Sequence, residues 1–168
     1  FLGEHGYTTA AAGTTHVARR PWHDVGALYD RTLNLDEVGR PDHATTVEAA
    51  VRYLNEPHDG PFFLSVGIPE PHRNNAHPHV YTQQWEEEPA DLDARYCRPF
   101  PHLPNNETTR REMANYMQGV TLMDRKMGAV LDALEAAGLV DDTYVICTTA
   151  NGPGMTEIDV IRGGSLLF

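Results

Sequence analysis

The sequence predicts an α/β fold of three layers (αβα), whose middle layer is a largely parallel sheet; the fold is expected to be incomplete at the N-terminus. Segments typical of strands and helices alternate along the chain, as they do in α/β folds. The run 62–68 is almost continuously apolar, which suits a strand buried on both faces of a parallel sheet. A chain of 168 residues, 40% of them apolar, can bury the core of one domain. We therefore expect residues 1–168 to form a single, partial domain.

The first elements are read from the segment "FLGEHGYTTAAAG". Its opening letters resemble the last turn of a helix that ends at Gly6, and a short strand of small and β-prone residues follows up to Gly13. The chain begins with Phe1 rather than methionine. We therefore expect it to be an internal fragment.

The middle elements are a helix over residues 45–55 and the strand over residues 62–68. Thr45 and Glu48 stand three residues apart, which predicts a capping box at the start of this helix. Proline residues flank the strand. A long irregular segment follows over residues 73–106, and loops of this length are usually functional or disordered.

The final elements are a long helix over residues 109–137 and a strand within "LVDDTYVICTTA". The helix carries apolar residues at spacings of three and four, a second capping pattern at Thr109 and Glu112, and Gly138 to end it. The apolar run of the last segment predicts another strand of the sheet.

Charge and hydropathy exclude two classes of partner. Thirteen basic residues against 24 acidic residues give a net charge of −11, which argues against general nucleic-acid binding. No apolar run approaches the ~18 residues of a membrane span, so we expect no membrane association. An acidic protein can still bind an anion in a local pocket.

Polar residues at three predicted strand ends could carry chemistry. His16 follows the first strand, His72 and Arg73 follow the second, and Asn151 follows the third. Each has an ordinary alternative, because loop histidines are often surface residues and Asn-Gly is a common turn pair. Together they are typical of one cleft at the carboxyl edge of an open sheet.

Three blocks in this order resemble the sulfatase family of the alkaline-phosphatase superfamily: "EHGYTTAAAGTTH", "GPFFLSVGIPEPHR" and "NYMQGVTLMDRKMGAVLDALEAAGLVDDTYVICTTANG". The details "GTTHVA" and "EPHRNNAH" are closer to the heparan N-sulfatase (sulfamidase) branch. The resemblance implies an alkaline-phosphatase-like fold and a partial sulfatase catalytic domain over residues 1–168. It also implies hydrolysis of sulfate esters or sulfamates, with a sulfated small molecule or glycan as partner.

The family uses Ca²⁺ and a formylglycine nucleophile made within a CxPxR motif. By resemblance, His16 matches the histidine of the family's GKxH block and His72 that of its DPH block, both catalytic. Arg73 is then a substrate-binding residue and Asn151 a metal ligand. The family is commonly exported, periplasmic or lysosomal, but the sequence leaves the compartment and the oligomeric state undetermined.

The departures from the family pattern concern charged positions. The family lysine of GKxH falls on Thr14, the metal-binding aspartate on Ala150, and a second lysine on or near Thr156. Each change removes a charge that would contact metal or sulfate. The CxPxR motif is absent, and "CRPFP" at Cys97 imitates only its first half. Cys97 is therefore interpreted as a decoy, and formylglycine is absent from this chain.

Three readings of function follow. The chain is a piece of a sulfatase that is inactive as it stands, a non-catalytic pseudosulfatase that binds an anion or glycan, or a gene fragment without a function of its own. The coding region upstream of Phe1 discriminates between the first two, since a CxPxR motif there favours a true sulfatase.

Overall fold

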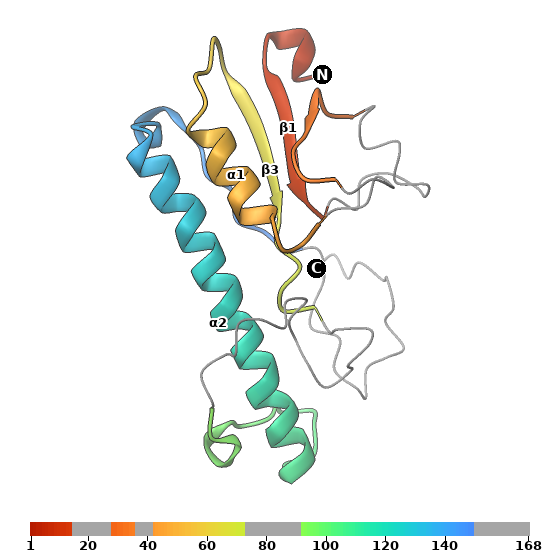
Figure 1. Cartoon of the computed structure of the whole chain (residues 1–168). Helices are drawn as coiled ribbons and strands as arrows, with labels where there is room; N and C mark the ends of the chain where they lie inside the picture. Colours follow the sequence, from red (N-terminus) through yellow and green to blue (C-terminus); the bar gives the residue numbers. More distant parts are fainter. Residues whose placement is uncertain (15–27, 36–41, 73–91, 150–168) are drawn as a thin grey trace. The chain divides into compact units, whose positions relative to one another are not determined.

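A computed structural model describes residues 1–14, 28–35, 42–72 and 92–149 of the chain (Figure 1). The chain divides into two compact units. The first comprises Phe1–Pro69 and Arg125–Asp142, and the second comprises Glu70–Asp124 and Thr143–Phe168.

The first unit is built on a parallel sheet with the strand order β2-β1-β3. Its strands are β1 (Thr8–Gly13), β2 (Arg31–Thr32) and β3 (Phe62–Gly67). β1 pairs with β3 along its whole length. The sequence correctly predicted β1 and β3, and the parallel sheet confirms the α/β class. The sequence analysis missed β2, because two residues are too few to show an alternating pattern.

A short 3₁₀ helix, η1 (Gly3–His5), leads into β1 and confirms the predicted helix tail. Gly6 ends it with a φ of 82° and donates its backbone N–H to the Gly3 carbonyl. This left-handed conformation is accessible to glycine at little cost.

Helix α1 (Thr46–Leu54) packs on one face of the sheet, as predicted (Figure 1). Ala49 and Ala50 contact Ala12 of β1, and the small side chains allow the helix to lie close to the strand. The predicted capping box is wrong. Thr45 is the N-cap residue, but its hydroxyl donates to the Asp42 carbonyl and carboxylate instead of accepting from the helix.

The long helix α2 (Glu107–Ala136) contributes its residues up to Asp124 to the second unit and the later ones to the first. In the first unit, Ala133 and Leu134 pack with Leu54 of α1. Partly buried apolar side chains complete this cluster: Val51, Phe62, Leu64, Val130 and Leu139. The sheet and both helical segments thus share one apolar core.

The ends of α2 agree only partly with the sequence. The cap lies three residues before the predicted position: the Asn106 side chain accepts from the Thr109 N–H, and the Thr109 hydroxyl accepts from the Asn106 N–H. Gly138, with a φ of 70°, ends the helix as predicted. The predicted apolar stripe is wrong at Met117 and Leu131, each 44% exposed.

The second unit has a small core around Cys97, Met113 and Ala114. A 3₁₀ helix, η3 (Ala94–Tyr96), precedes Cys97 within the segment that the sequence predicted to be irregular. Leu92, Ala94, Phe100, Leu103 and Tyr116 pack around this core.

The predicted last strand is not formed in the described residues. After the 3₁₀ helix η4 (Val140–Asp142), residues 143–149 have neither helix nor strand structure. Tyr144 is 98% exposed and Ile146 85% exposed. A strand exists only where its backbone groups pair with a neighbour, and the described strands offer this segment no such pairing. The apolar composition of this segment therefore predicted one strand more than the described residues form.

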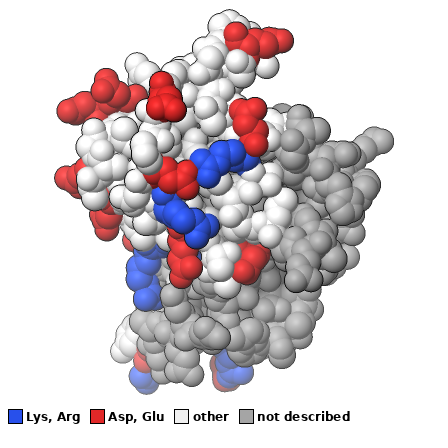
Figure 2. Space-filling view, turned by 45° about the horizontal axis from the view of Figure 1, so that its top comes forward, with Lys and Arg blue, Asp and Glu red and all other residues white. Residues whose placement is uncertain are grey.

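The excess of acidic residues in the composition is visible on the face of the described residues that Figure 2 shows. Acidic side chains outnumber basic ones on the face shown, and a basic side chain there lies beside acidic ones. Among the described residues, no helix combines the length and apolarity that a membrane span requires.

Candidate functional site

The carboxyl ends of β1 and β3 lie side by side in the first unit. Gly13 and Gly67 are partners in the last pair of the parallel register. The backbone N–H of Thr14 then donates to the Gly67 carbonyl at 3.0 Å, so the pairing continues one step beyond the strand. Ligands of open parallel sheets bind at this edge. The backbone of Thr14 is therefore held in place at the candidate site.

Glycine is required at both strand ends. A Cβ atom on Gly13 would lie 2.3 Å from the Gly67 carbonyl oxygen and 2.6 Å from a methyl carbon of Thr46. A Cβ atom on Gly67 would lie 1.8 Å from the Thr14 carbonyl oxygen. Gly13 also has a φ of 77°, which other residues rarely adopt. The two strand ends approach each other more closely than side chains would permit.

Asn34 ties three segments together beneath this edge. Its side-chain oxygen accepts from the Gly13 N–H at 2.8 Å, and its amide nitrogen donates to the Asp42 carbonyl at 2.7 Å and to the Thr46 hydroxyl at 3.1 Å. Asn34 is 9% exposed, so these bonds are made away from water. The sequence analysis missed this residue, because Asn34 lies in the mostly polar stretch "DRTLNLDE" and nothing there distinguishes it.

His43 lies beside Thr14 at the same edge. Its ring nitrogen Nδ1 is 3.4 Å from the Thr14 hydroxyl oxygen, and both residues are half-buried. His43 was also missed, because it precedes a helix and follows no strand directly. The neighbouring acid Asp42 bonds within its own turn, accepting from the Ala44 N–H at 3.0 Å and from the Thr45 hydroxyl at 3.1 Å.

Of the four site residues predicted from the sequence, only His72 lies within the described part of the chain. It is exposed, and it belongs to the second unit, just after the cis bond between Glu70 and Pro71. The other predicted site residues, and two of the three altered positions, lie outside the described residues: His16, Arg73, Asn151, Ala150 and Thr156. The described residues therefore do not test whether these groups meet in one cleft.

The donors of a metal site do not converge in the described residues. No three His, Cys, Asp or Glu side chains there lie close enough together to hold a metal ion. The calcium-ligand positions that the family resemblance implies, Ala150 and Asn151, lie outside the described residues, and no chemical step is routed through the ion below.

Cys97 is a core residue. It is 6% exposed, packs against Met113 and Ala114, and its thiol donates to the Asp93 carbonyl at 3.6 Å. Burial among apolar side chains is typical of an inert structural cysteine. The structure contains both Cys97 and Cys147 as free thiols.

Ion pairs and hydrogen bonds stabilise the opposite, amino edge of the sheet. Asp30 accepts from the Thr9 N–H and hydroxyl, each at 2.8 Å, and these bonds lower the pKa of its carboxyl group. Arg31 binds Glu56 at 2.6 Å and lowers the pKa of that carboxyl group. The Arg31 guanidinium also lies 5.1 Å from the ring centre of Tyr53. These contacts hold β2 in place at the amino edge of the sheet.

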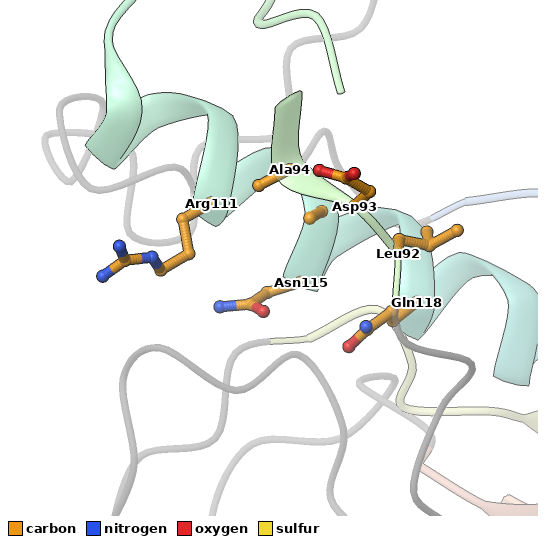
Figure 3. Close-up of a pocket in the computed structure, with 7 residues that line it drawn as sticks. Leu92, Asp93, Ala94, Arg111, Asn115 and Gln118 are labelled. Carbon is orange, nitrogen blue, oxygen red and sulfur yellow. The ribbon is translucent and has the colours of Figure 1, made fainter. Parts of the chain in front are cut away.

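The second unit has an open pocket of about 480 Å³ on α2 (Figure 3). Its charged side chains are already paired: Arg111 binds Glu107 at 2.7 Å, and Asp93 binds Arg95 at 2.6 Å. In Figure 3 Arg111 extends away from Asp93. The pocket is lined by Leu92, Asp93, Ala94, Arg111, Ala114, Asn115 and Gln118. It offers an anion no unpaired cation among these residues, so it is a weaker candidate than the sheet edge.

Comparison with known proteins identifies the family. The family model for Sulfatase matches residues 1–166. The chain belongs to the sulfatase family. The sulfatase chain is also 28% identical over 173 residues to human N-sulphoglucosamine sulphohydrolase, which covers 90% of this chain. It spans about a third of that relative's length, since the match covers 33% of the human protein.

Family membership relates the sheet of this chain to the fold of the sulfatase family. The family match confirms the alkaline-phosphatase-like αβα fold predicted from the three blocks, and the relative agrees with the predicted sulfamidase branch. Within the sulfatase chain, β1 leads to Thr14 and β3 leads toward His72. Both belong to blocks that carried the resemblance.

Proposed function

We propose that this sulfatase-family protein is a hydrolase of sulfate esters or sulfamates, and that the chain as it stands is inactive. Its substrate class is a sulfated small molecule or glycan. The observation that carries the proposal is the family match over residues 1–166. Two neighbouring parallel strands that end at one edge, in register from Thr8 to Gly13, support it by providing the usual place for a ligand.

The proposed roles follow the family pattern residue by residue. His16 and His72 assist the leaving group as proton donors, since imidazole exchanges protons near neutral pH. Arg73 binds the sulfate oxygens, for which its planar set of donors is well suited. Asn151 occupies a metal-ligand position, because amide oxygens suit a hard cation such as Ca²⁺.

Inactivity follows from the charges that the chain lacks. Thr14 stands at the position of a family lysine and Ala150 at that of a metal-binding aspartate. A third position, on or near Thr156, also lacks its lysine. Anion binding and transition-state stabilisation both depend on such groups. The chain also contains no CxPxR motif from which a formylglycine could be made.

A second candidate function is that of a pseudosulfatase, which binds the anion without hydrolysing it. The contact between Thr14 and His43 supports it, because a substituted position here makes a specific polar contact at the strand end. In this alternative the protein binds the same class of sulfated ligand in the same cleft but does not hydrolyse it.

Restoring the missing charges in the full-length protein tests the proposal. The variant Thr14→Lys with Ala150→Asp should bind Ca²⁺ more tightly than the parent, measured by calorimetry, and should gain hydrolysis of an aryl sulfate or a sulfamate. A matched control, Thr121→Lys with Ala129→Asp on exposed positions of α2, adds the same charges away from the site. Equal calcium affinity in the parent and both variants would overturn the assignment of Thr14 and Ala150 to the family positions.

A further inference from the structure

We propose that Asn106 is a modification site that accepts an N-linked oligosaccharide. Asn106, Glu107 and Thr108 form the tripeptide N-x-T, with a residue other than proline in the middle, which is the acceptor pattern for this modification. The other asparagines of the sequence start no N-x-S or N-x-T tripeptide. Because such a tripeptide also arises by chance, its place in the fold decides whether it can serve as an acceptor. This inference goes beyond the proposed function and does not rest on it.

The tripeptide lies on the surface of the second unit, where the chain enters α2. Asn106 directly precedes Glu107, the first residue of the helix, and both are exposed, as is Thr108. The Glu107 carboxylate binds Arg111 at 2.7 Å, and the side chains of this pair are 87% and 67% exposed. An N-linked oligosaccharide is bulky and hydrated, so it requires such a surface position.

The two polar atoms of the Asn106 side chain have separate roles. Oδ1 accepts from the Thr109 N–H at 3.0 Å and caps the first turn of α2. A backbone N–H only donates, so the atom that faces it is the oxygen, and the amide nitrogen Nδ2 points elsewhere. Within the described residues Nδ2 makes no hydrogen bond. The nitrogen that receives the oligosaccharide therefore belongs to an exposed side chain and is not needed by the fold.

The fold tolerates the modification for the same reason. An N-linked asparagine keeps its amide oxygen, so the glycosylated side chain can still accept from the Thr109 N–H. The turn is also held by contacts that do not involve Nδ2, since Arg110 donates to the Arg95 carbonyl and to Oδ1 of Asn105. Asn106 therefore stands on a fixed turn with and without an oligosaccharide.

Thr108 supplies the third part of the acceptor pattern. Its side chain is exposed, and its hydroxyl makes no hydrogen bond to the part of the chain that the structure describes. The fold thus leaves this hydroxyl for recognition by the transferase, which reads the residue two positions after the asparagine.

The transfer step balances with a co-reactant of the secretory pathway, an oligosaccharide linked to a lipid through pyrophosphate. Nδ2 of Asn106 forms a bond to C1 of the first sugar, and the bond between C1 and the pyrophosphate oxygen breaks. The lipid pyrophosphate leaves with the electron pair of that bond, and the amide nitrogen loses one proton. The step needs neither an oxidant nor a reductant.

Secretion of the chain from cultured eukaryotic cells tests the site. The chain is exported behind a secretion leader and compared by electrophoresis before and after treatment with a peptide-N-glycosidase, which converts a glycosylated asparagine to aspartate. We expect a band of lower mobility that shifts back after treatment, and mass spectrometry of the treated peptides should find aspartate at position 106. The same chain made in bacteria without an oligosaccharyl transferase is the reference for the unmodified mobility. A secreted chain without a glycosidase-sensitive shift would overturn the proposal.

Variants assign the modification to the tripeptide. Thr108→Ala and Asn106→Gln should each abolish the shift. Thr108→Ser should keep it, because it keeps the hydroxyl, and Asn105→Gln, next to the acceptor but outside the tripeptide, is the matched control that should also keep it. Thr108→Ala leaves the Asn106 cap in place, so its result does not depend on a change in the helix start. A shift that persisted in Thr108→Ala, or that disappeared in Asn105→Gln, would overturn the assignment to Asn106.

Discussion

At the residue scale, Asn34 joins three segments at the carboxyl edge of the sheet, although no motif indicated it. One buried amide satisfies a backbone N–H, a backbone carbonyl and a hydroxyl from three segments. Motif reading finds residues that react with ligands, and it passes over those that hold the reactive segments in position.

Asn34→Ala should lower the free energy of unfolding by about 3 kcal/mol, because it leaves the buried Gly13 N–H without its partner and removes the bonds from Asn34 to the Asp42 carbonyl and the Thr46 hydroxyl. Urea denaturation of the chain measures this value. The matched control is Asn55→Ala, whose side chain binds only the Val51 carbonyl on the exposed end of α1. That control should change stability by about 0.5 kcal/mol or less. Equal losses in the two variants would contradict the role given to Asn34.

Asp30 gives a prediction for acid pH. Its folded-state pKa is lowered, so its hydrogen bonds to Thr9 stabilise the fold at pH values above the ordinary carboxylate range. This contribution is lost as the pH falls through the folded-state pKa, below about pH 4. Asp30→Asn should therefore be less stable than the parent at neutral pH and should lose less stability on acidification.

Unfolding curves at several pH values measure this difference. Asp132→Asn, at an exposed position of α2, is the control and should follow the parent at every pH. If Asp30→Asn and the parent lost the same stability between neutral and acid pH, the bonds to Thr9 would not be the source of the effect.

At the element scale, periodicity predicted helices well and predicted one strand wrongly. Both helices lie within two residues of their expected bounds, because a helix makes its backbone hydrogen bonds within its own segment. A strand depends on a neighbour that is often distant in sequence. The segment 143–149 has the composition of a strand, but the described strands provide no partner for it. The long-range pairing of strands is the part of the fold that local sequence does not encode.

The apolar face of α2 in the first unit gives the prediction at this scale. Leu134→Ala should lower stability by about 3 kcal/mol, since the side chain is 6% exposed and packs with Leu54 and Ala133. Leu131→Ala is the matched control on the same helix, where the leucine is 44% exposed, and should cost about 1 kcal/mol or less. Thermal or urea unfolding of the two variants gives the comparison. Similar losses would mean that the core is not where the structure has it.

At the scale of the whole molecule, the family was readable from the sequence because three blocks occur in a fixed order, and the family match over residues 1–166 confirms it. The candidate site was less readable. The sequence indicated strand ends, and the structure confirms that β1 and β3 end side by side. The sequence did not indicate His43. This residue lies at the edge because α1 packs on the sheet and the turn before α1 therefore lies next to Thr14.

Turnover measured on the chain itself tests the central claim most directly, namely that this is a sulfatase chain whose site lacks the charges needed for hydrolysis. The chain is incubated with an aryl sulfate or a sulfamate, with and without Ca²⁺, beside a control that contains no protein. We predict no product above the control in any condition. Steady, calcium-dependent turnover would contradict the claim, because it would show that Thr14 and Ala150 do not remove the activity.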